Sequence, residues 1–395
     1  MYIYADNAAT TKMSKRAMEA MVPYMHEIYG NPSSLHTAGQ KAAEALSEAR
    51  RRVAKILNCD AGEIYFTSGG SEADNQAILS AARLGEKRGK KHIVSTAFEH
   101  HAVLHTLKRL EKEGFEVTLL DVHANGLVTA AQVEAAIRPD TCLVTVMYAN
   151  NEIGTIQPIG DIGKICREKG VLFHTDAVQA AGHLRIDVKR LQVDLLSISG
   201  HKFHGPKGVG ALYARKGVRL TNLIEGGAQE KGKRAGTENI PAIMGMAAAL
   251  EESYEHLEDK MIHVAGLRDR LMQGLSAIPH SAVNGDTARR LPGNVSFCFE
   301  GIEGESLLLM LDDKGVAASS GSACTSGSLD PSHVLLAIGR PHEVAHGSLR
   351  LSLSAENTKE EIDRIIAAVT EVVDYLRQIS PVWRDLQNGK RDYIL

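Results

Sequence analysis

The stretch DLLSISGHKFHGPKGVGALYA, residues 194–214, contains two apolar runs separated by an irregular polar segment. The runs Leu195–Ser199 and Gly208–Tyr213 have the length and composition of buried strands. His201 and Lys202 follow the first run, where several glycines and a proline keep the backbone irregular. Because ligands bind beyond the carboxyl ends of the strands in open parallel sheets, this segment is a candidate binding site.

Apolar runs of the same kind alternate with helical patterns from about residue 60 to residue 215. Five further runs have strand character: Glu63–Thr67, His92–Ser95, Glu116–Leu120, Cys142–Met147 and Val171–His174. Amphipathic stretches such as Glu72–Arg88 and Ile159–Lys169 lie between several of these runs. Because alternating strands and helices build parallel sheets that are covered on both faces, we expect an α/β fold with a mostly parallel, seven-stranded sheet.

The remainder of the chain has a different pattern. A long helical pattern runs from Ile240 to about Ile278. Beyond it, Asn294–Phe299 and Val316–Ser319 are strand candidates, and Lys359–Gln378 has the pattern of an amphipathic helix. This mixture predicts a smaller α+β unit at the C-terminal end.

We therefore expect two domains, with the long helical pattern joining them. The large domain is expected to span residues 15–260, and the small domain residues 1–14 and 261–395. The tail beyond Ser380 is expected to be weakly held, although Trp383 could attach it to the surface.

Composition excludes several classes of protein. The 395 residues are 44% apolar and 24% charged, which is typical of a globular protein. The net charge of −3 gives no basic field, so nucleic acid is not expected as a ligand. No apolar run approaches the roughly 18 residues of a membrane helix, and the first residues do not resemble a secretory signal. Five cysteines without CxxC spacing argue against a disulfide framework, so we expect a cytoplasmic enzyme without a membrane partner.

Polar residues follow the predicted strands at the expected binding edge. The turn TSGGSEADN puts Gly70 and Ser71 at a helix start, where N–H groups and the helix dipole suit a phosphate, although an ordinary capped helix has the same pattern. His100 follows the next strand and could stack on a planar ligand or move protons. His101 and His105 are spaced for a metal, but no third ligand with suitable spacing follows.

The next strand ends carry an amide, a carboxylate and an amine. Asn151 follows one strand, and Asp176 and Gln179 follow another. The Asp176 carboxylate could hold a protonated ring nitrogen or simply cap a helix. Lys202, close to His201 in an irregular segment, could form a Schiff base. The combination of these groups at successive strand ends is more specific than any one of them.

These residues belong to motifs that extend along nearly the whole chain: ADNAATT (5–11), GNPSSLH (30–36), TSGGSEADN (67–75), EHHAVL (99–104), NNEIG (150–154), HTDAVQ (174–179), SGHKFHGPKG (199–208), RAGTEN (234–239), SGSACTSGS (320–328) and SLRLSL (348–353). In this order they resemble the class V aminotransferase group of pyridoxal-phosphate enzymes, and specifically the cysteine desulfurases of the IscS/NifS type. The resemblance implies a PLP-dependent transferase-like fold whose large domain binds pyridoxal 5'-phosphate. It also implies conversion of L-cysteine to L-alanine, with the sulfur passed to acceptors for iron–sulfur cluster, thio-cofactor or tRNA biosynthesis.

The resemblance assigns a role to each candidate residue by its position. Lys202 is similar to the lysine that links covalently to the cofactor, Asp176 to the partner of the ring nitrogen, and Gln179 to the partner of the phenolic oxygen. His100 is expected to stack on the ring and to move protons, and Asn151 to contact both cofactor and substrate. Four residues are assigned to the cofactor phosphate: Gly70, Ser71, Ser199 and His201.

The substrate and the sulfur are assigned to the second part of the chain. Arg350 resembles the arginine that binds the substrate carboxylate. Cys324, in the small and polar segment 319–332, is expected to lie in a mobile loop and to take the sulfur as a persulfide. Thr237 resembles a residue that reaches the phosphate of the neighbouring subunit, which implies a homodimer. The expected partner is a sulfur-acceptor protein such as an iron–sulfur scaffold, and no fixed metal site is expected, although Cys324 could be a transient cluster ligand.

The other cysteines and two alternative functions complete the prediction. Cys142, Cys166 and Cys298 lie in apolar runs and are expected in the core, whereas Cys59 receives no role. A selenocysteine lyase or a cysteine-sulfinate desulfinase of the same fold would depend less on Cys324. A scaffold that only docks a sulfur acceptor would not need the cofactor residues.

Overall fold

The computed structural model describes residues 2–320 and 331–395. Within them, a sheet of seven strands has the order β2-β8-β7-β6-β5-β3-β4. Its strands are β2 (Ile64–Thr67), β3 (His92–Thr96), β4 (Glu116–Leu120), β5 (Thr141–Thr145), β6 (Leu172–Asp176), β7 (Leu195–Ser199) and β8 (Gly210–Ala214). β4, β3, β5, β6 and β7 pair in parallel, and β8 is antiparallel to both of its neighbours. Each of the seven predicted strands is confirmed, with end points that differ by at most two residues.

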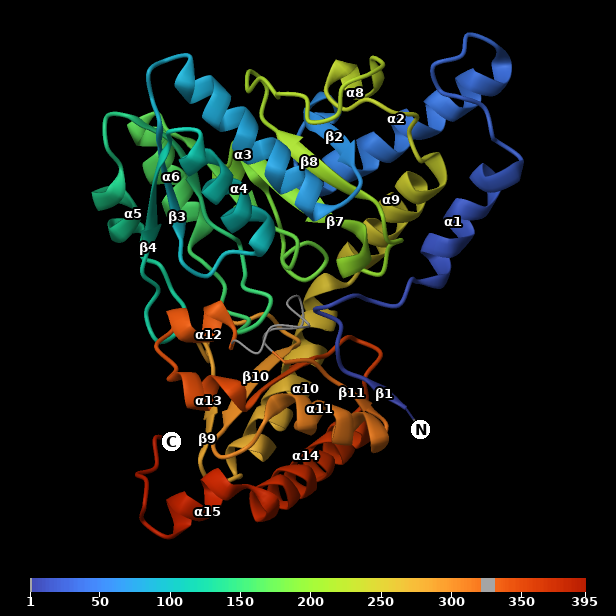
Figure 1. Ribbon diagram of the computed structural model, residues 1–395. Helices are drawn as coiled ribbons and strands as arrows, with labels where there is room; N and C mark the ends of the chain where they lie inside the picture. The colour runs from blue at the N-terminus through green and yellow to red at the C-terminus, as the bar shows by residue number, and fades with distance from the viewer. Residues whose placement is uncertain (1, 321–330) are drawn as a thin grey trace.

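Helices cover both faces of this sheet (Figure 1). They are α1 (Lys15–His26), α2 (Thr37–Leu57), α3 (Gly70–Glu86), α4 (His101–Lys112), α5 (Ala130–Ala136), α6 (Ile159–Lys169), α7 (Val188–Leu191), α8 (Gln229–Gly232) and α9 (Ile240–Tyr254), with short 3-10 turns at Ala61–Glu63 and Gly200–Lys202. Successive strand residues face opposite sides, so Val144 packs in a first core with α2, α6 and α9, and Leu143 packs with α3 and α4. Burial on both faces explains why these strands are continuous apolar runs.

A second group of elements lies below the large sheet in Figure 1. An antiparallel sheet has the order β12-β10-β9, and β1 pairs in parallel with β11. The elements are β1 (Ile3–Tyr4), β9 (Ser281–Val283), β10 (Asn294–Phe299), β11 (Val316–Ala317), β12 (Ser348–Ser352), α10 (Leu257–Ser276), α11 (Gly304–Asp313), α12 (His333–Ala337), α13 (His342–His346), α14 (Lys359–Ile379) and α15 (Pro381–Gln387). A second core forms where α10, α11 and α14 pack on these strands. The strand predicted at 294–299 and the helix predicted near 359–378 are confirmed, whereas the strand predicted at 316–319 is shorter.

The long helix predicted from residue 240 to residue 278 is wrong as one element. It is divided into α9 and α10 by His256, whose backbone has the left-handed conformation with φ 52°. A left-handed residue ends the helical hydrogen-bond ladder, so the chain changes direction there. No glycine or proline marks this break in the sequence.

The prediction of a weakly held tail is also wrong. The Trp383 ring stacks 4.0 Å from the Arg377 guanidinium, as the prediction of an attachment at Trp383 anticipated. Tyr393 stacks on His280 with ring centroids 3.9 Å apart, and the last two backbone N–H groups donate to Glu300 at 2.8 and 3.1 Å. The contacts of the last residues join the tail to positions about 90 to 115 residues earlier, which local sequence patterns do not report.

Two features bear on the class of protein. Within residues 2–320 and 331–395, each helix is too short or too polar to span a bilayer. Cys142, Cys166 and Cys298 are buried as expected, and Cys59 is partly buried. Burial raises the pKa of each of these four thiols, so all four are poor nucleophiles at neutral pH.

Candidate active site

The predicted site residues of the large sheet converge at the carboxyl ends of its parallel strands. Asp176 is the last residue of β6, His100 follows β3, and Lys202 follows β7. The Lys202 charge lowers the pKa of both Asp176 and His100, so the three groups lie within electrostatic range of one another. The topology therefore brings an amine, a carboxyl group and an imidazole to one edge of the sheet.

The Lys202 amine lies against the N-terminal segment of the chain. Its Nζ donates to the carbonyl oxygens of Ala8 and Ala9 at 2.6 and 2.8 Å. Gln179 Nε2 donates to the same Ala8 oxygen at 2.9 Å. The motif ADNAATT thus forms one side of the site, although no residue in it was assigned a role from the sequence. The sequence signal for this segment was its match to a family motif.

Three buried carboxyl groups lie behind this edge. Burial raises the pKa of Asp176 to about 6, while a hydrogen bond from Val178 N and the Lys202 charge lower it. Burial raises the pKa of Glu99 to about 8, and burial and the Asp176 charge raise that of Asp74 well above its usual range. Of the three, Asp176 is the one whose pKa the Lys202 charge lowers. Asp74 and Glu99 were not identified from the sequence.

His100 is held as a neutral imidazole. It caps α4, and its Nδ1 accepts a hydrogen bond from Ala102 N at 3.1 Å, so the ring proton is on Nε2. Burial and the Lys202 charge lower the pKa of His100 to about 4. His101 lies 5.2 Å from His105 and 4.7 Å from His333 between ring centroids. Among the described residues, no group of three or more metal-ligating side chains is arranged to hold an ion.

The residues assigned to the phosphate lie where α3 and β7 approach each other. A Cβ atom on Gly70 would lie 2.6 Å from Val178 Cγ2 and 3.5 Å from Ser199 Cβ, so glycine allows this close approach. Ser71 is exposed in the first turn of α3. His201 Nδ1 lies 3.1 Å from Thr10 Oγ1, and burial lowers its pKa to about 4. These positions offer helix N–H groups and hydroxyl groups to an anion.

Arg350 lies on β12, next to the segment that follows β5. Its Nη2 donates to Asp6 Oδ1 at 2.9 Å, and its Nη1 donates to Asn151 O at 3.3 Å. Its Nε is buried and has no hydrogen-bond partner among the described residues. A buried guanidinium with an unused donor fits a carboxylate ligand. Asp6 was not identified from the sequence.

Two predicted residues are not among the groups described above. Cys324 lies outside the described residues. Thr237 is exposed in the segment between α8 and α9, and Arg234 in the same segment pairs with Glu72 of α3 at 2.9 Å. This ion pair holds the Thr237 segment near the start of α3.

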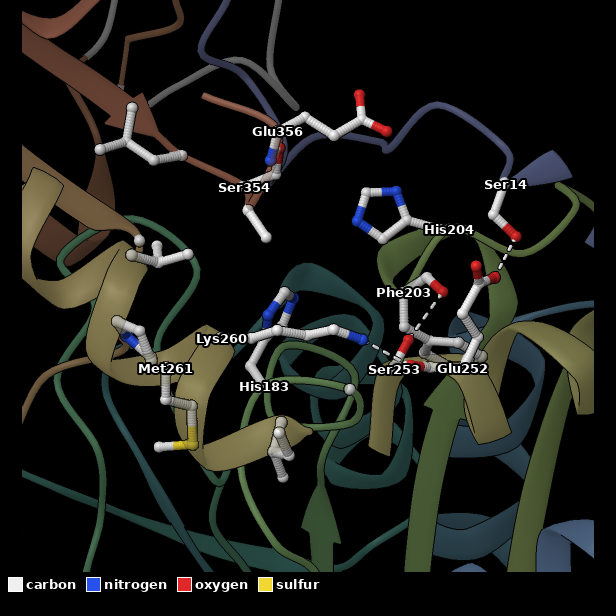
Figure 2. A pocket seen from close by; sticks show the side chains of 17 residues that line it. Ser14, His183, Phe203, His204, Glu252, Ser253, Lys260, Met261, Ser354 and Glu356 are labelled. Carbon is white, nitrogen blue, oxygen red and sulfur yellow. Dashed lines mark hydrogen bonds between the residues drawn. The ribbon is translucent and has the colours of Figure 1, made fainter. Parts of the chain in front are cut away.

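A separate cavity of about 190 Å³ lies behind the Lys202 segment (Figure 2). Ser253 Oγ donates to Phe203 O, and Ser14 and Lys260 bond to Glu252 across the cavity. Its lining contains none of the predicted site residues. The cavity therefore borders the backbone that carries Lys202 without being part of the predicted site.

The donor set fits pyridoxal 5'-phosphate. An amine, a buried carboxyl group and an imidazole lie at one strand edge, a tightly packed helix start lies beside them, and the Arg350 Nε is an orphaned donor. A ring nitrogen, a phosphate and a substrate carboxylate are the groups that such donors and acceptors would bind.

Comparison with known proteins identifies the family. The model of the aminotransferase class-V family matches residues 3–365. The chain is 53% identical to the cysteine desulfurase IscS of Clostridium botulinum strain Hall over 99% of both chains, and 54% identical to that of Methanosarcina thermophila over 96% of this chain and 94% of that one. A solved NifS-like protein superimposes with a TM-score of 0.90 at 40% identity, over 95% of this chain and 100% of the other. The chain therefore belongs to the class V aminotransferase family and, within it, to the pyridoxal-phosphate-dependent cysteine desulfurases.

Proposed function

We propose that this cysteine desulfurase activates L-cysteine with Lys202 and transfers its sulfur to Cys324. Pyridoxal phosphate, when bound, supplies a ring that accepts the negative charge developing at the substrate Cα. The observation that carries this assignment is the placement of Lys202 within electrostatic range of both Asp176 and His100. An amine held between a carboxyl group and a neutral imidazole can bind the cofactor and then take the Cα proton.

The other cofactor residues have supporting roles. Asp176, whose pKa a nearby cation lowers, would keep a proton on the ring nitrogen by charge attraction. When the cofactor is bound, Gln179 would donate an amide hydrogen bond to the phenolic oxygen and His100 would stack on the ring. The phosphate is held by four residues: Gly70, Ser71, Ser199 and His201. Helix N–H groups satisfy a phosphate without a metal ion.

Arg350 and Asn151 bind the substrate. The orphaned Nε of Arg350 and the adjacent Nη form a planar fork that matches a carboxylate. The Asn151 carbonyl orients the guanidinium from the other side. Binding of the carboxylate fixes the orientation of the substrate, so that the substrate Cα hydrogen points at one catalytic group.

Cys324 completes the reaction. Its thiolate attacks the substrate sulfur, an S–S bond forms, and the substrate Cβ–S bond breaks. The bonding electron pair stays on the carbon fragment, which takes up a proton and leaves as L-alanine. The sulfur is oxidised, the carbon is reduced, and no external oxidant is needed. His100 is the group proposed to move the proton of the substrate thiol: at rest Nε2 carries the ring proton and Nδ1 accepts from Ala102 N, so the ring can take up a further proton only when Nδ1 releases Ala102 N.

Two variants test these assignments. Lys202→Ala is expected to lose the yellow colour of the protein and all alanine formation. Cys324→Ala is expected to keep the colour and lose sulfide and alanine formation from L-cysteine. Unchanged turnover of L-cysteine by Cys324→Ala would overturn the assignment and favour a selenocysteine lyase or a cysteine-sulfinate desulfinase.

We also propose a homodimer in which Thr237 reaches the phosphate of the other subunit. Large apolar side chains are exposed on and after α1 and in the segment after β8: Met18, Val22, Met25, Tyr29, Leu35 and Ile224. Such a concentration supports contact with a second copy of the chain. Sedimentation at micromolar concentration tests the dimer, and a monomer would contradict it.

The acceptor, the location and the domain division are proposals as well. We propose a sulfur-acceptor protein such as an iron–sulfur scaffold, and a cytoplasmic location consistent with four unpaired thiols among the described residues. We propose domains at residues 15–260 and at 1–14 with 261–395, which the second core supports, although α12 and α13 pack on the first core.

A further inference from the structure

Glu152 is a buried carboxyl group that has no role in the steps above. It follows Asn151, and its Oε2 accepts a hydrogen bond from the Ser332 hydroxyl. Ser332 is also buried, and its Oγ accepts hydrogen bonds from Val334 N and Leu335 N at 3.1 and 3.4 Å. The Ser332 hydroxyl thus accepts the N–H groups at the start of α12 and donates its own proton to Glu152.

The two ends of the segment that contains Cys324 are attached to the same corner of the site. At one end, Ser319 forms backbone hydrogen bonds with Arg350 in both directions, at 2.6 and 3.1 Å. At the other end, Ser332 is bound to Glu152, the neighbour of Asn151. The Arg350 side chain connects the two attachments, because its Nη1 donates to Asn151 O.

The two attachments join different parts of the molecule. Val334 and Leu335 of α12 pack in the first core, whereas β12, which carries Arg350, packs in the second core. The chain therefore leaves one core at Ser319 and enters the other at Ser332. Glu152 holds Ser332 at this second point, where His333 Nε2 also lies 3.0 Å from Glu99 O.

We propose that Glu152 is a positioning residue for persulfide formation on Cys324: through Ser332 it fixes the start of α12, where the described chain resumes, beside the corner that holds Arg350. This inference rests on the proposed roles of Cys324 and Arg350. A carboxylate is a stronger acceptor than a neutral group, and burial keeps water from replacing it. Burial raises the pKa of Glu152 to about 7, while the Arg350 charge lowers it, so the two side chains also interact electrostatically.

The experiment separates positioning of the thiol from assembly of the site. The holoenzyme is compared with Glu152→Ala, Glu152→Gln and Ser332→Ala. Exchange of the L-alanine Cα hydrogen with solvent deuterium, followed by NMR, reports the cofactor, Lys202 and Arg350. The rate of persulfide formation on Cys324 in a single turnover with L-cysteine, followed by mass spectrometry, reports the reach of the thiol.

We expect Glu152→Ala and Ser332→Ala to slow persulfide formation about tenfold or more, because misplacement of a reacting group is costly, with deuterium exchange within about twofold of wild type. Glu152→Gln keeps a carbonyl acceptor for Ser332 and is expected to recover most of the rate. Glu63→Ala is the matched control, because Glu63 is also buried and accepts hydrogen bonds from two backbone N–H groups away from the site. It is expected to change neither rate.

Three results would each overturn one of the proposals. Persulfide formation at the wild-type rate in Glu152→Ala would overturn the positioning role. An equal loss of exchange and of persulfide formation would overturn it too, because it would show a general structural defect. Alanine formation from L-cysteine by Cys324→Ala would instead overturn the proposed function, and that variant is assayed separately.

Discussion

Arg350 and Arg377 are both buried on elements of the second core, with exposed fractions of 3% and 5%, yet their nitrogen atoms have different partners. Arg377 donates from Nε, Nη1 and Nη2 to three backbone carbonyl oxygens, at 3.1, 2.8 and 2.9 Å. Its guanidinium also stacks on Trp383. Every donor group of this arginine is therefore engaged in holding the chain together.

By comparison, the guanidinium of Arg350 is not saturated with hydrogen-bond acceptors among the described residues. One of its bonds goes to the Asp6 carboxylate, another goes to a carbonyl at 3.3 Å, and its Nε has no partner among the described residues. A buried donor without a partner is costly in a folded protein, so its persistence indicates a ligand. The difference is that Arg377 is saturated by its own chain, whereas Arg350 keeps a donor available for the substrate carboxylate that we propose it binds.

Of the variants that test this comparison, Arg350→Lys is expected to have the largest effect on catalysis. Lysine keeps the charge but loses the planar fork, so kcat/KM for L-cysteine should fall about 100-fold, which corresponds to about 2.7 kcal/mol. The melting temperature should stay close to that of wild type. Steady-state kinetics and thermal denaturation measure the two quantities. A KM within about threefold of wild type would show that the unused donors of Arg350 do not bind substrate.

Arg377→Met is expected to have the opposite pattern. Three buried carbonyl groups lose a charged donor, so the free energy of unfolding should fall by about 3 kcal/mol while KM and kcat stay unchanged. Urea denaturation and the same kinetic assay test both parts. A change in KM larger than the change in stability would make Arg377 part of the site, and the comparison between the two arginines would fail.

Glu152→Gln should change the pH dependence of stability. Burial raises the pKa of Glu152 from 4.5 to about 7, so between these values the folded protein holds a proton that the unfolded chain has released. This contribution to stability is present below pH 4.5 and is lost as pH rises through 7, by up to about 3 kcal/mol. Glutamine does not titrate, so the variant lacks that decline.

The measurement is the difference in free energy of unfolding between wild type and Glu152→Gln at several pH values. Other titrating groups cancel in this difference. Parallel curves for the two proteins would show that Glu152 titrates normally. A buried acid would then not distinguish Arg350 from Arg377, which lies close to the buried Glu300.

Much of the fold could be predicted because it depends on local patterns. Strands buried on both faces are continuous apolar runs, which is why β2 to β8 were found. The break at His256 could not be predicted, because no glycine or proline occurs there and the helical pattern continues on both sides. The tail was misjudged because its contacts, such as Tyr393 on His280, join distant parts of the chain.

The candidate site also contains residues that could be predicted from the sequence and residues that could not. Residues that follow strands, such as Asp176 and Lys202, could be located because topology alone brings strand ends together. Asp6 and Glu99 could not, because each depends on packing between elements, and the pairing of Glu152 with Ser332 could not for the same reason. Asp6 contacts a residue 344 positions away in the chain. Their roles require the distances and burial that only the folded chain provides.

Asp6→Asn is expected to have the smallest effect. Asparagine keeps an oxygen for Arg350 Nη2 but removes the negative charge 2.9 Å away, so an arriving carboxylate meets less competition. Because Asp6 is partly exposed and its charge is screened, KM for L-cysteine should fall only about threefold. Glu356→Gln, which removes an exposed carboxylate in the segment after β12, is the control and should leave KM unchanged. A tenfold rise in KM for Asp6→Asn would mean that Asp6 orients the guanidinium, and Arg350 would then differ from Arg377 in the geometry of its partners rather than in charge.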